Sequence, residues 1–268
     1  MLKTRIISSI VGLVLFMTAM LIHDVAATVL IAAISVIAMI ELLSALKTSG
    51  HNPVSTIGIL SCAVIMYGII SPDYRDPLLY MLAAVSIGLS LVMIFRHEKY
   101  SVADAALTLF AIAYIVFMFS FIARTRLMIN GAHTVWIIFA GSWGADTAAY
   151  FTGRQYGRKK LLPEISPNKT VEGALGGLIG GIVFVMLIGI FIKPYVKDIS
   201  WFDFASMGII CGLFSQLGDW TASLIKRFTG VKDFGKIIPG HGGVLDRFDS
   251  VMITAPLIYA YLKLIVRI

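Results

Sequence analysis

Charged residues concentrate in one stretch of this chain, residues 223–249, which reads SLIKRFTGVKDFGKIIPGHGGVLDRFD and lies between two strongly apolar segments. Its ionisable residues are Lys226, Arg227, Lys232, Asp233, Lys236, His241, Asp246, Arg247 and Asp249. Carboxylates gathered in this way suit Mg²⁺, which usually takes one or two of them together with substrate phosphates and water. The neighbouring cations could hold several phosphates. The stretch therefore indicates chemistry on a metal-bound phosphate compound.

Two further acids lie inside apolar runs. Asp146 stands in WIIFAGSWGADTAAYF and Asp219 in IICGLFSQLGDWTASLIKRF. A charged residue at the centre of a membrane helix costs about 3 kcal/mol on insertion scales, so such residues usually face a cavity. A structural hydrogen bond or an ion pair is the alternative for both. Ser223 and Lys226 follow Asp219 at helical spacing, so an acid, a hydroxyl group and a cation line one helix face.

The end of the charged stretch offers a second group of candidates. Asp246 and Asp249 are three residues apart and share a helix face, although the helix dipole alone would favour an acid at Asp249. The backbone N–H groups of Gly242 and Gly243 could form an anion-binding nest. His241 could bind phosphate, orient an acid or have no direct role.

A polar segment at residues 153–170 precedes another apolar run. Within it SPNKTVEG, residues 166–173, is predicted to start a helix whose positive end attracts phosphate. Capping alone would account for Thr170, but Lys169 beside it is a candidate phosphate ligand. The other cations of the segment serve equally well as orientation signals or anionic-lipid contacts: Arg154, Arg158, Lys159 and Lys160.

The elements that must position these residues are membrane helices. The chain of 268 residues is 58% hydrophobic and 14% charged, against about 45–50% and about 25% in soluble domains. A backbone in lipid must satisfy its own hydrogen bonds, which predicts an all-α polytopic membrane protein. We expect one membrane domain, with N-terminal spans in residues 1–130 and a catalytic part in residues 131–268. Nine spans are predicted, at about 5–22, 25–46, 54–71, 77–95, 102–123, 133–152, 171–192, 203–227 and 250–267.

The distribution of Lys and Arg predicts the orientation. With the N-terminus in the cytosol, the cytosolic segments hold most of the 22 basic residues. The polar loops 153–170 and 228–249 then face the cytosol, so the active-site cavity is expected to open to the cytosol from the cell (inner) membrane.

The net charge of +7 does not indicate nucleic acid, because the basic residues lie in short loops between spans. Cys62 and Cys211 lie in apolar runs and offer no disulfide framework or metal spacing.

One predicted span, 171–192, is rich in glycine. Residues at spacings of four place small side chains on one face and permit close helix contact. Packing within the chain is the simpler interpretation, and a homodimer through this face is the alternative. The residues are Gly173, Gly176, Gly177, Gly180 and Gly181.

The charged stretch resembles the signature of the phosphatidate cytidylyltransferases, also called CDP-diacylglycerol synthases. That signature reads S-x-aliphatic-K-R-x4-K-D-x-G-x3-P-x-H-G-G-x-x-D-R-x-D, and residues 223–249 fill each fixed position. The upstream family segments are also present, as GADTAAYFTGRQYGR and SPNKTVEG. Asn168 stands where the family commonly has lysine, which leaves Lys169 as the cation of that motif. Length and span number match as well, so the resemblance covers the whole chain.

The resemblance implies a transfer of CMP from CTP to phosphatidic acid, giving CDP-diacylglycerol and pyrophosphate. It implies Mg²⁺ on Asp219 and Asp246, with Asp249 in support and Asp146 at the cavity floor, where a second cation could bind. Lys226, Arg227 and Arg247 would neutralise phosphates, and Lys169 would reach the triphosphate or the lipid headgroup. The remaining substrate-binding candidates are Ser223, Lys232, Asp233, His241, Gly242 and Gly243. Membrane lipids are the expected surroundings.

Two other functions fit parts of the sequence. Buried acids and a glycine-rich helix also suit a transporter of an anionic solute, but residues 1–130 show no counterpart of the charged loops that an inverted repeat would give. A phosphatidyltransferase that consumes CDP-lipids would share substrates with the family above. Its D-G-x-x-A-R motif is absent from the sequence.

Overall fold

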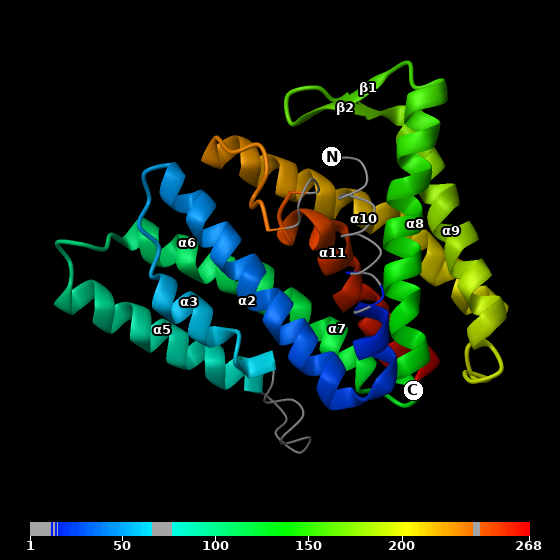
Figure 1. Cartoon of the computed structure of the whole chain (residues 1–268), viewed down its shortest axis with the longest axis horizontal. Helices are drawn as coiled ribbons and strands as arrows, with labels where there is room; N and C mark the ends of the chain where they lie inside the picture. The colour runs from blue at the N-terminus through cyan, green and yellow to red at the C-terminus, as the bar shows by residue number, and fades with distance from the viewer. Residues whose placement is uncertain (1–11, 13, 15, 66–76, 238–241) are drawn as a thin grey trace. The chain divides into compact units, whose positions relative to one another are not determined.

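The computed structural model describes residues 12, 14, 16–65, 77–237 and 242–268, and helices make up most of them (Figure 1). The chain forms two compact units. The first contains Met1–Ala123 and Lys226–Arg247, and the second contains Arg124–Ile225 and Phe248–Ile268. Most of the charged stretch 223–249 therefore belongs to the same unit as the N-terminal helices. The predicted division into residues 1–130 and a catalytic part 131–268 stays a prediction.

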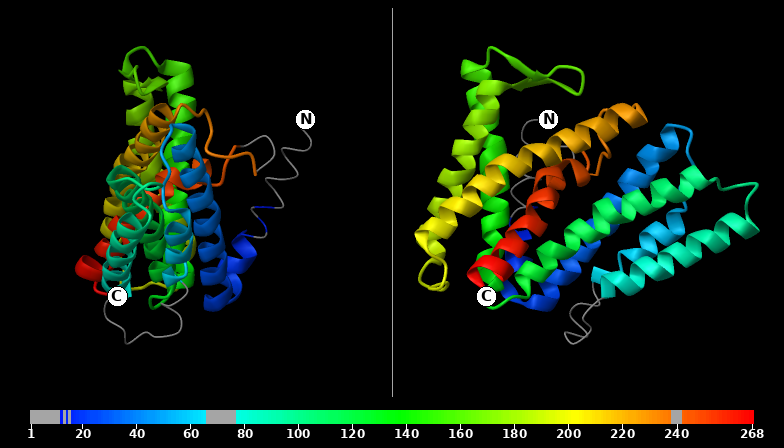
Figure 2. Two further views of the ribbon diagram at one scale, coloured as in Figure 1. Left: turned by 90° about the vertical axis from the view of Figure 1, so that its left-hand side faces the viewer. Right: turned by 180° about the vertical axis from the view of Figure 1, so that it is seen from behind.

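Helix α2 (Asp24–Thr48) is the long helix of the first unit, and it packs against α3 (Ser55–Ser61) and α6 (Val102–Ile112). Helix α5 (Pro77–Phe95) lies against α3 and α6, as Figure 2 also shows. A π-helical stretch, η1 (Ala113–Phe117), continues α6 into α7 (Met118–Arg126).

The start of α6 is fixed by a capping box. The Ser101 Oγ accepts from the Asp104 N–H, and the Asp104 carboxylate accepts from the Ser101 N–H. The same carboxylate accepts from the Asn52 N–H at 2.5 Å, which ties the turn after α2 to this helix. Asp104 is thus a buried acid with a structural role in the first unit.

The second unit is built around α8 (Gly131–Tyr156) and α9 (Val171–Ile192), which run side by side (Figures 1 and 2). Close packing depends on glycine: a Cβ on Gly177 would lie 3.1 Å from the Ala149 Cβ, and one on Gly181 would lie 2.6 Å from the Gly212 N. All five glycines singled out in the predicted span 171–192 contact α8 or α10 (Trp201–Thr229). Packing within the chain accounts for them, and the homodimer stays a prediction.

A hairpin joins α8 to α9. Strands β1 (Lys160–Leu162) and β2 (Ser166–Thr170) pair antiparallel, with Lys160 opposite Thr170 and Leu162 opposite Ser166. The expectation that residues 166–173 start a helix is correct only from Thr170 onward. The Thr170 side chain accepts from the Gly173 N–H at 3.1 Å and caps α9, while the residues before it form the strand.

Four helical stretches of the described chain are long and apolar enough to cross a membrane: Asp24–Thr48, Val102–Arg126, Val171–Ile192 and Leu245–Val266. Together with the helical content, they make the chain an all-α membrane protein, as predicted. Helices α2, α5 and α9 agree closely with the spans predicted at 25–46, 77–95 and 171–192. Much of the spans predicted at 5–22 and 54–71 lies outside the described residues, so the number nine stays a prediction.

The last helix begins before the predicted span at 250–267, and it includes Asp246 and Asp249, which were predicted to share a helix face. Helix α11 (Leu245–Tyr261) starts at Leu245 instead of residue 250 and continues into the π-helical stretch η2 (Leu262–Val266). The first N–H groups of a helix have no partner within the helix. Here acidic side chains bind the N–H groups at the helix start, so the helix can form before the apolar run begins.

Candidate active site

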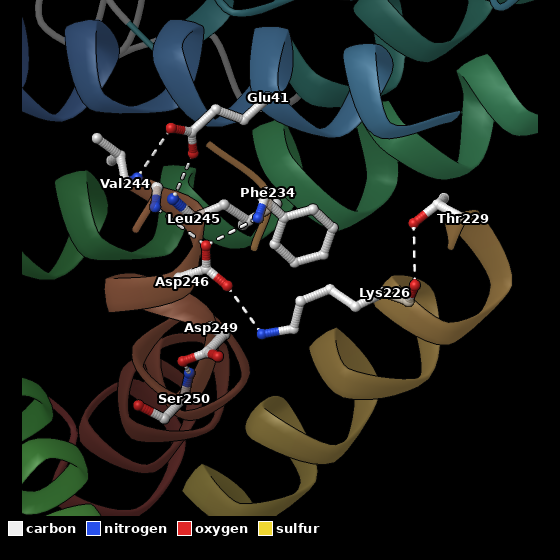
Figure 3. Close-up of polar contacts among 10 residues, drawn as sticks. Glu41, Lys226, Thr229, Phe234, Val244, Leu245, Asp246, Asp249 and Ser250 are labelled. Carbon is white, nitrogen blue, oxygen red and sulfur yellow. Dashed lines mark hydrogen bonds and ion pairs between the residues drawn. The ribbon is translucent and has the colours of Figure 1, made fainter. Parts of the chain in front are cut away.

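Asp246 is the centre of a polar cluster in the first unit. Its Oδ1 accepts from the Lys226 Nζ at 2.8 Å, and its Oδ2 accepts from the N–H groups of Phe234 at 2.9 Å and Gly243 at 3.1 Å (Figure 3). The Asp246 side chain is only 4% exposed. The Lys226 ammonium also lies 5.5 Å from the centroid of the Phe234 ring. One carboxylate therefore joins the end of α10, the following loop and the turn before α11.

Glu41 on α2 completes this cluster, and sequence reasoning missed it. Its Oε1 accepts from the Val244 N–H at 3.0 Å, and its Oε2 accepts from the Leu245 N–H at 2.8 Å (Figure 3). The residue is 4% exposed. An acid inside an apolar span is by default a candidate functional residue. That signal, applied to Asp146 and Asp219, would also have found Glu41.

The glycines of the signature have steric roles in this cluster. A Cβ on Gly243 would lie 2.7 Å from the Glu41 Oε2, and a Cβ on Gly235 would run into the Glu41 Oε1. Gly242 has a φ of 85°, a conformation that favours glycine. The Gly243 N–H, expected to help form an anion nest, donates to Asp246 in this structure.

Lys169 forms the corresponding centre in the second unit. It stands near the end of β2 and pairs with the Asp219 Oδ2 on α10. Burial by itself would lower the pKa of the Lys169 ammonium, but Asp219, with Asp146 and Asp249, raises that pKa above its ordinary value. Three of the predicted acids therefore act on one predicted cation.

A close helix crossing explains how Asp249 comes near this group. A Cβ on Gly218 of α10 would lie 2.8 Å from the Ser250 Cα, so the two backbones nearly touch there. Asp219 follows Gly218 directly, and Asp249 precedes Ser250. The Asp249 Oδ1 accepts from the Ser250 N–H at 2.8 Å, and the residue is buried.

A cavity of about 320 Å³ adjoins Lys169 in the second unit. Helix α8, the hairpin, α9 and α10 all contribute to its wall. Its polar and aromatic lining includes Tyr150, Arg154, Asn168, Lys169, Gln216 and Trp220. The Gln216 Nε2 donates to backbone oxygens of Ala174 at 3.1 Å and Gly212 at 2.6 Å, which fixes the amide at the cavity wall. The cavity combines cations with apolar surface, as a phosphate carrying an apolar group would require.

Asp146 lies on α8, and the other predicted site residues belong to the signature stretch 223–249. Ser223 is half-buried on α10. The exposed residues are Arg227, Lys232, Asp233, Lys236 and Arg247. His241 lies outside the described residues.

The acids fit a magnesium ion by donor chemistry. A carboxylate has about four lone-pair sites, and Asp246 uses three of them, which leaves Oδ1 one further position. Asp219 has one oxygen paired with Lys169, and its side chain is 23% exposed. Among the described residues no group of three or more His, Cys, Asp or Glu side chains could form a complete metal site. Magnesium needs only one or two carboxylates when phosphates and water supply the rest.

The class of protein is thus an all-α membrane protein with two acid–lysine pairs, Lys226–Asp246 and Lys169–Asp219. Comparison with known proteins adds the family: the model of the "Cytidylyltransferase family" matches residues 3–265. The chain belongs to this family.

Named relatives agree with the family match. Phosphatidate cytidylyltransferase of Staphylococcus saprophyticus is 36% identical over 260 residues, covering 96% of this chain and 97% of that protein. The enzyme of the same name from Staphylococcus aureus is 36% identical over 263 residues with the same coverage of both chains. That of Staphylococcus haemolyticus is 35% identical over 257 residues, again covering 96% and 97%.

Proposed function

We propose that this chain is a phosphatidate cytidylyltransferase, which transfers CMP from CTP to phosphatidic acid and releases pyrophosphate. The observation that carries the proposal is the similarity to relatives of that name over 96% of this chain. The predicted site residues support it, because Lys226 and Asp246 are directly bonded, and Lys169 pairs with Asp219.

The reaction joins two phosphates without a covalent enzyme intermediate. A phosphate oxygen of the lipid attacks the α-phosphorus of CTP in line, the α–β bridging bond breaks, and pyrophosphate leaves with its electron pair. Such a transfer needs positioning and charge neutralisation more than covalent help. The lipid phosphate is already an adequate nucleophile, so a protein general base is not required.

The residues have separate tasks in this proposal. Asp219 and Asp246 would hold Mg²⁺, directly or through water, and Asp249 would support them. The ion, when bound, neutralises charge on the phosphates. Lys226, Arg227 and Arg247 bind phosphate oxygens at the signature segment. The remaining substrate-binding residues are Asp146, Lys169, Ser223, Lys232, Asp233, His241, Gly242 and Gly243, with a second cation near Asp146.

The cavity beside Lys169 supports a place for a substrate phosphate in the second unit. The Lys169 ammonium supplies positive charge at the cavity wall, and Arg154 supplies a second positive charge.

In the proposed topology of nine spans, the N-terminus and both polar loops lie in the cytosol and the active-site cavity opens there. Thiol labelling of single cysteines placed at Lys160 and Lys197 would test it. Only the second should react from outside intact cells.

A transporter of an anionic solute is the competing function. Purified protein with radiolabelled CTP, phosphatidic acid and Mg²⁺ separates the two. Label that appears in lipid only when phosphatidic acid is present supports the synthase. Uptake of solute into vesicles without labelled lipid would contradict the proposal and favour transport. Consumption of added CDP-lipid with an alcohol acceptor would instead identify a phosphatidyltransferase.

A further inference from the structure

We propose that Glu41 is a positioning residue for the reaction: from helix α2 it fixes the start of α11 and so the direction in which Asp246 presents its carboxylate. The inference rests on the proposed function, in which Asp246 belongs to the catalytic site. It assigns a role to the N-terminal helices, which carry none of the signature residues.

The two oxygens of Glu41 match two N–H donors at the start of α11. Each Glu41 oxygen accepts one backbone N–H, from Val244 at 3.0 Å and from Leu245 at 2.8 Å. Hydrogen bonds to an ionised carboxylate are about twice as strong as those between neutral groups. The helix dipole of α11 adds to them, because its positive end faces the acid. Burial of Glu41 in an apolar helix is therefore compensated by the start of α11.

Two acids divide the N–H groups at the start of α11 between them. Glu41 binds those of Val244 and Leu245, while Asp246 binds that of Gly243 and reaches back to Phe234 (Figure 3). With its Oδ2 held in this way, Asp246 turns its Oδ1 toward Lys226. Without Glu41 the N–H groups of Val244 and Leu245 would lack partners, and Asp246 is the nearest acid in the sequence that could take them. The Asp246 Oδ1 would then no longer point toward Lys226.

The segment around Glu41 leaves space for this side chain only because two of its residues are glycines. A Cβ on Gly235 would run into the Glu41 Oε1, and one on Gly243 would lie 2.7 Å from the Oε2. Two glycines of the signature are thus complementary to a side chain outside the signature. A helix cap alone would need neither glycine, so the geometry points to a fixed position for the whole turn.

The experiment compares Glu41→Gln with a matched control, Asp104→Asn. Both replace a buried acid of the first unit that accepts backbone N–H groups, but Asp104 holds the start of α6 and not the signature segment. Glutamine keeps one acceptor and turns an NH₂ group toward the other N–H. The measurements are kcat and KM for CTP, per folded molecule, and the unfolding temperature in detergent.

For Glu41→Gln we expect a loss in kcat of roughly tenfold or more, with KM for CTP changed by less than about threefold. For Asp104→Asn we expect a lower unfolding temperature and kcat within about twofold of wild type. Unchanged kcat per folded Glu41→Gln molecule would overturn the inference and leave Glu41 as a helix cap only. An equal kcat loss in Asp104→Asn would overturn it as well.

A second variant keeps the inference testable if Glu41→Gln does not fold. Gly235→Ala keeps the Glu41 side chain but adds a methyl group that would displace its carboxylate. This variant should show the same selective loss of kcat. Its control is Gly88→Ala on α5, where an added Cβ makes an ordinary contact of 3.4 Å with the Ile57 Cδ1. A Gly235→Ala enzyme with normal kcat would contradict the positioning role.

A measurement without catalysis separates this inference from the proposed function. Thermal unfolding of Glu41→Gln is compared in the wild-type and Asp246→Asn backgrounds, because groups that act together give non-additive effects. We expect the temperature shift caused by Glu41→Gln to fall to half or less in the second background. Additive shifts would overturn the coupling, whatever the substrate. A wild-type chain that makes no CDP-lipid would refute the proposed function and leave this coupling intact.

Discussion

Replacement of Lys226 by methionine tests the central ion pair, because it removes the ammonium and keeps most of the side-chain volume. The Lys226 side chain is 17% exposed and its partner Asp246 only 4%, with 2.8 Å between Nζ and Oδ1. Breaking a fully buried pair costs about 3–5 kcal/mol. Asp246 keeps its bonds to Phe234 and Gly243, so the loss approaches that of one charged hydrogen bond, about 2 kcal/mol. For a chain of this size, that corresponds to a fall of about 4–8 °C in Tm.

The two cysteines provide the assay. Cys62 and Cys211 are 1% and 0% exposed, so a thiol-reactive dye labels them only as the protein unfolds. Lys232→Met is the matched control, since Lys232 is an exposed cation of the same segment. An exposed charge contributes little, so its Tm should change by less than about 1 °C.

The same variants separate stability from substrate binding. Lys226→Met should also raise KM for CTP, because Lys226 is proposed to neutralise phosphate. A Tm equal to that of Lys232→Met would refute the reasoning on the buried pair. An unchanged dependence on CTP concentration would refute the phosphate role of Lys226, even with a lowered Tm.

The remaining predictions concern the metal, the second unit and its cavity. Asp246→Asn should abolish turnover, and excess EDTA should silence the wild-type enzyme until Mg²⁺ is added; activity that persists in EDTA would remove the metal from the mechanism. The raised Lys169 pKa keeps the Lys169–Asp219 pair charged up to high pH. The Tm advantage of wild type over Lys169→Met should therefore be constant from about pH 7 to about pH 10, and should disappear as pH rises through the raised pKa. A difference that disappears at lower pH would contradict the raised pKa. Ala174→Trp should fill the cavity beside Lys169 and raise KM for one substrate severalfold at unchanged Tm, and normal KM values for both would exclude the cavity as a substrate site.

The sequence was sufficient for the parts of the site that depend on local spacing. Thr170 caps α9 as its position before an apolar run suggests, and α2, α5 and α9 follow from their apolar runs. Lys226 and Asp246, singled out by residue type, are directly bonded. In each case one segment, or one recognisable signature, contains the information.

The rest depends on tertiary contacts. Glu41 accepts hydrogen bonds from Val244 and Leu245, which lie 203 and 204 residues away in the sequence, and no local pattern predicts these contacts. Helix α11 begins at Leu245, where Glu41 and Asp246 bind the N–H groups at its start, whereas hydropathy alone placed the start of the span at residue 250. Strand β2 forms because β1 is available to pair with it, and a five-residue strand has too short a pattern to be recognised alone.

The composition of the first unit has a consequence for how the chain matures. A ribosome makes the helices within Met1–Ala123 first, but that unit is complete only when Lys226–Arg247 has been synthesised. Until then the Glu41 carboxylate sits in an apolar helix without the N–H groups that compensate it. The first unit therefore stays incompletely assembled until a segment that is synthesised after most of the second unit becomes available.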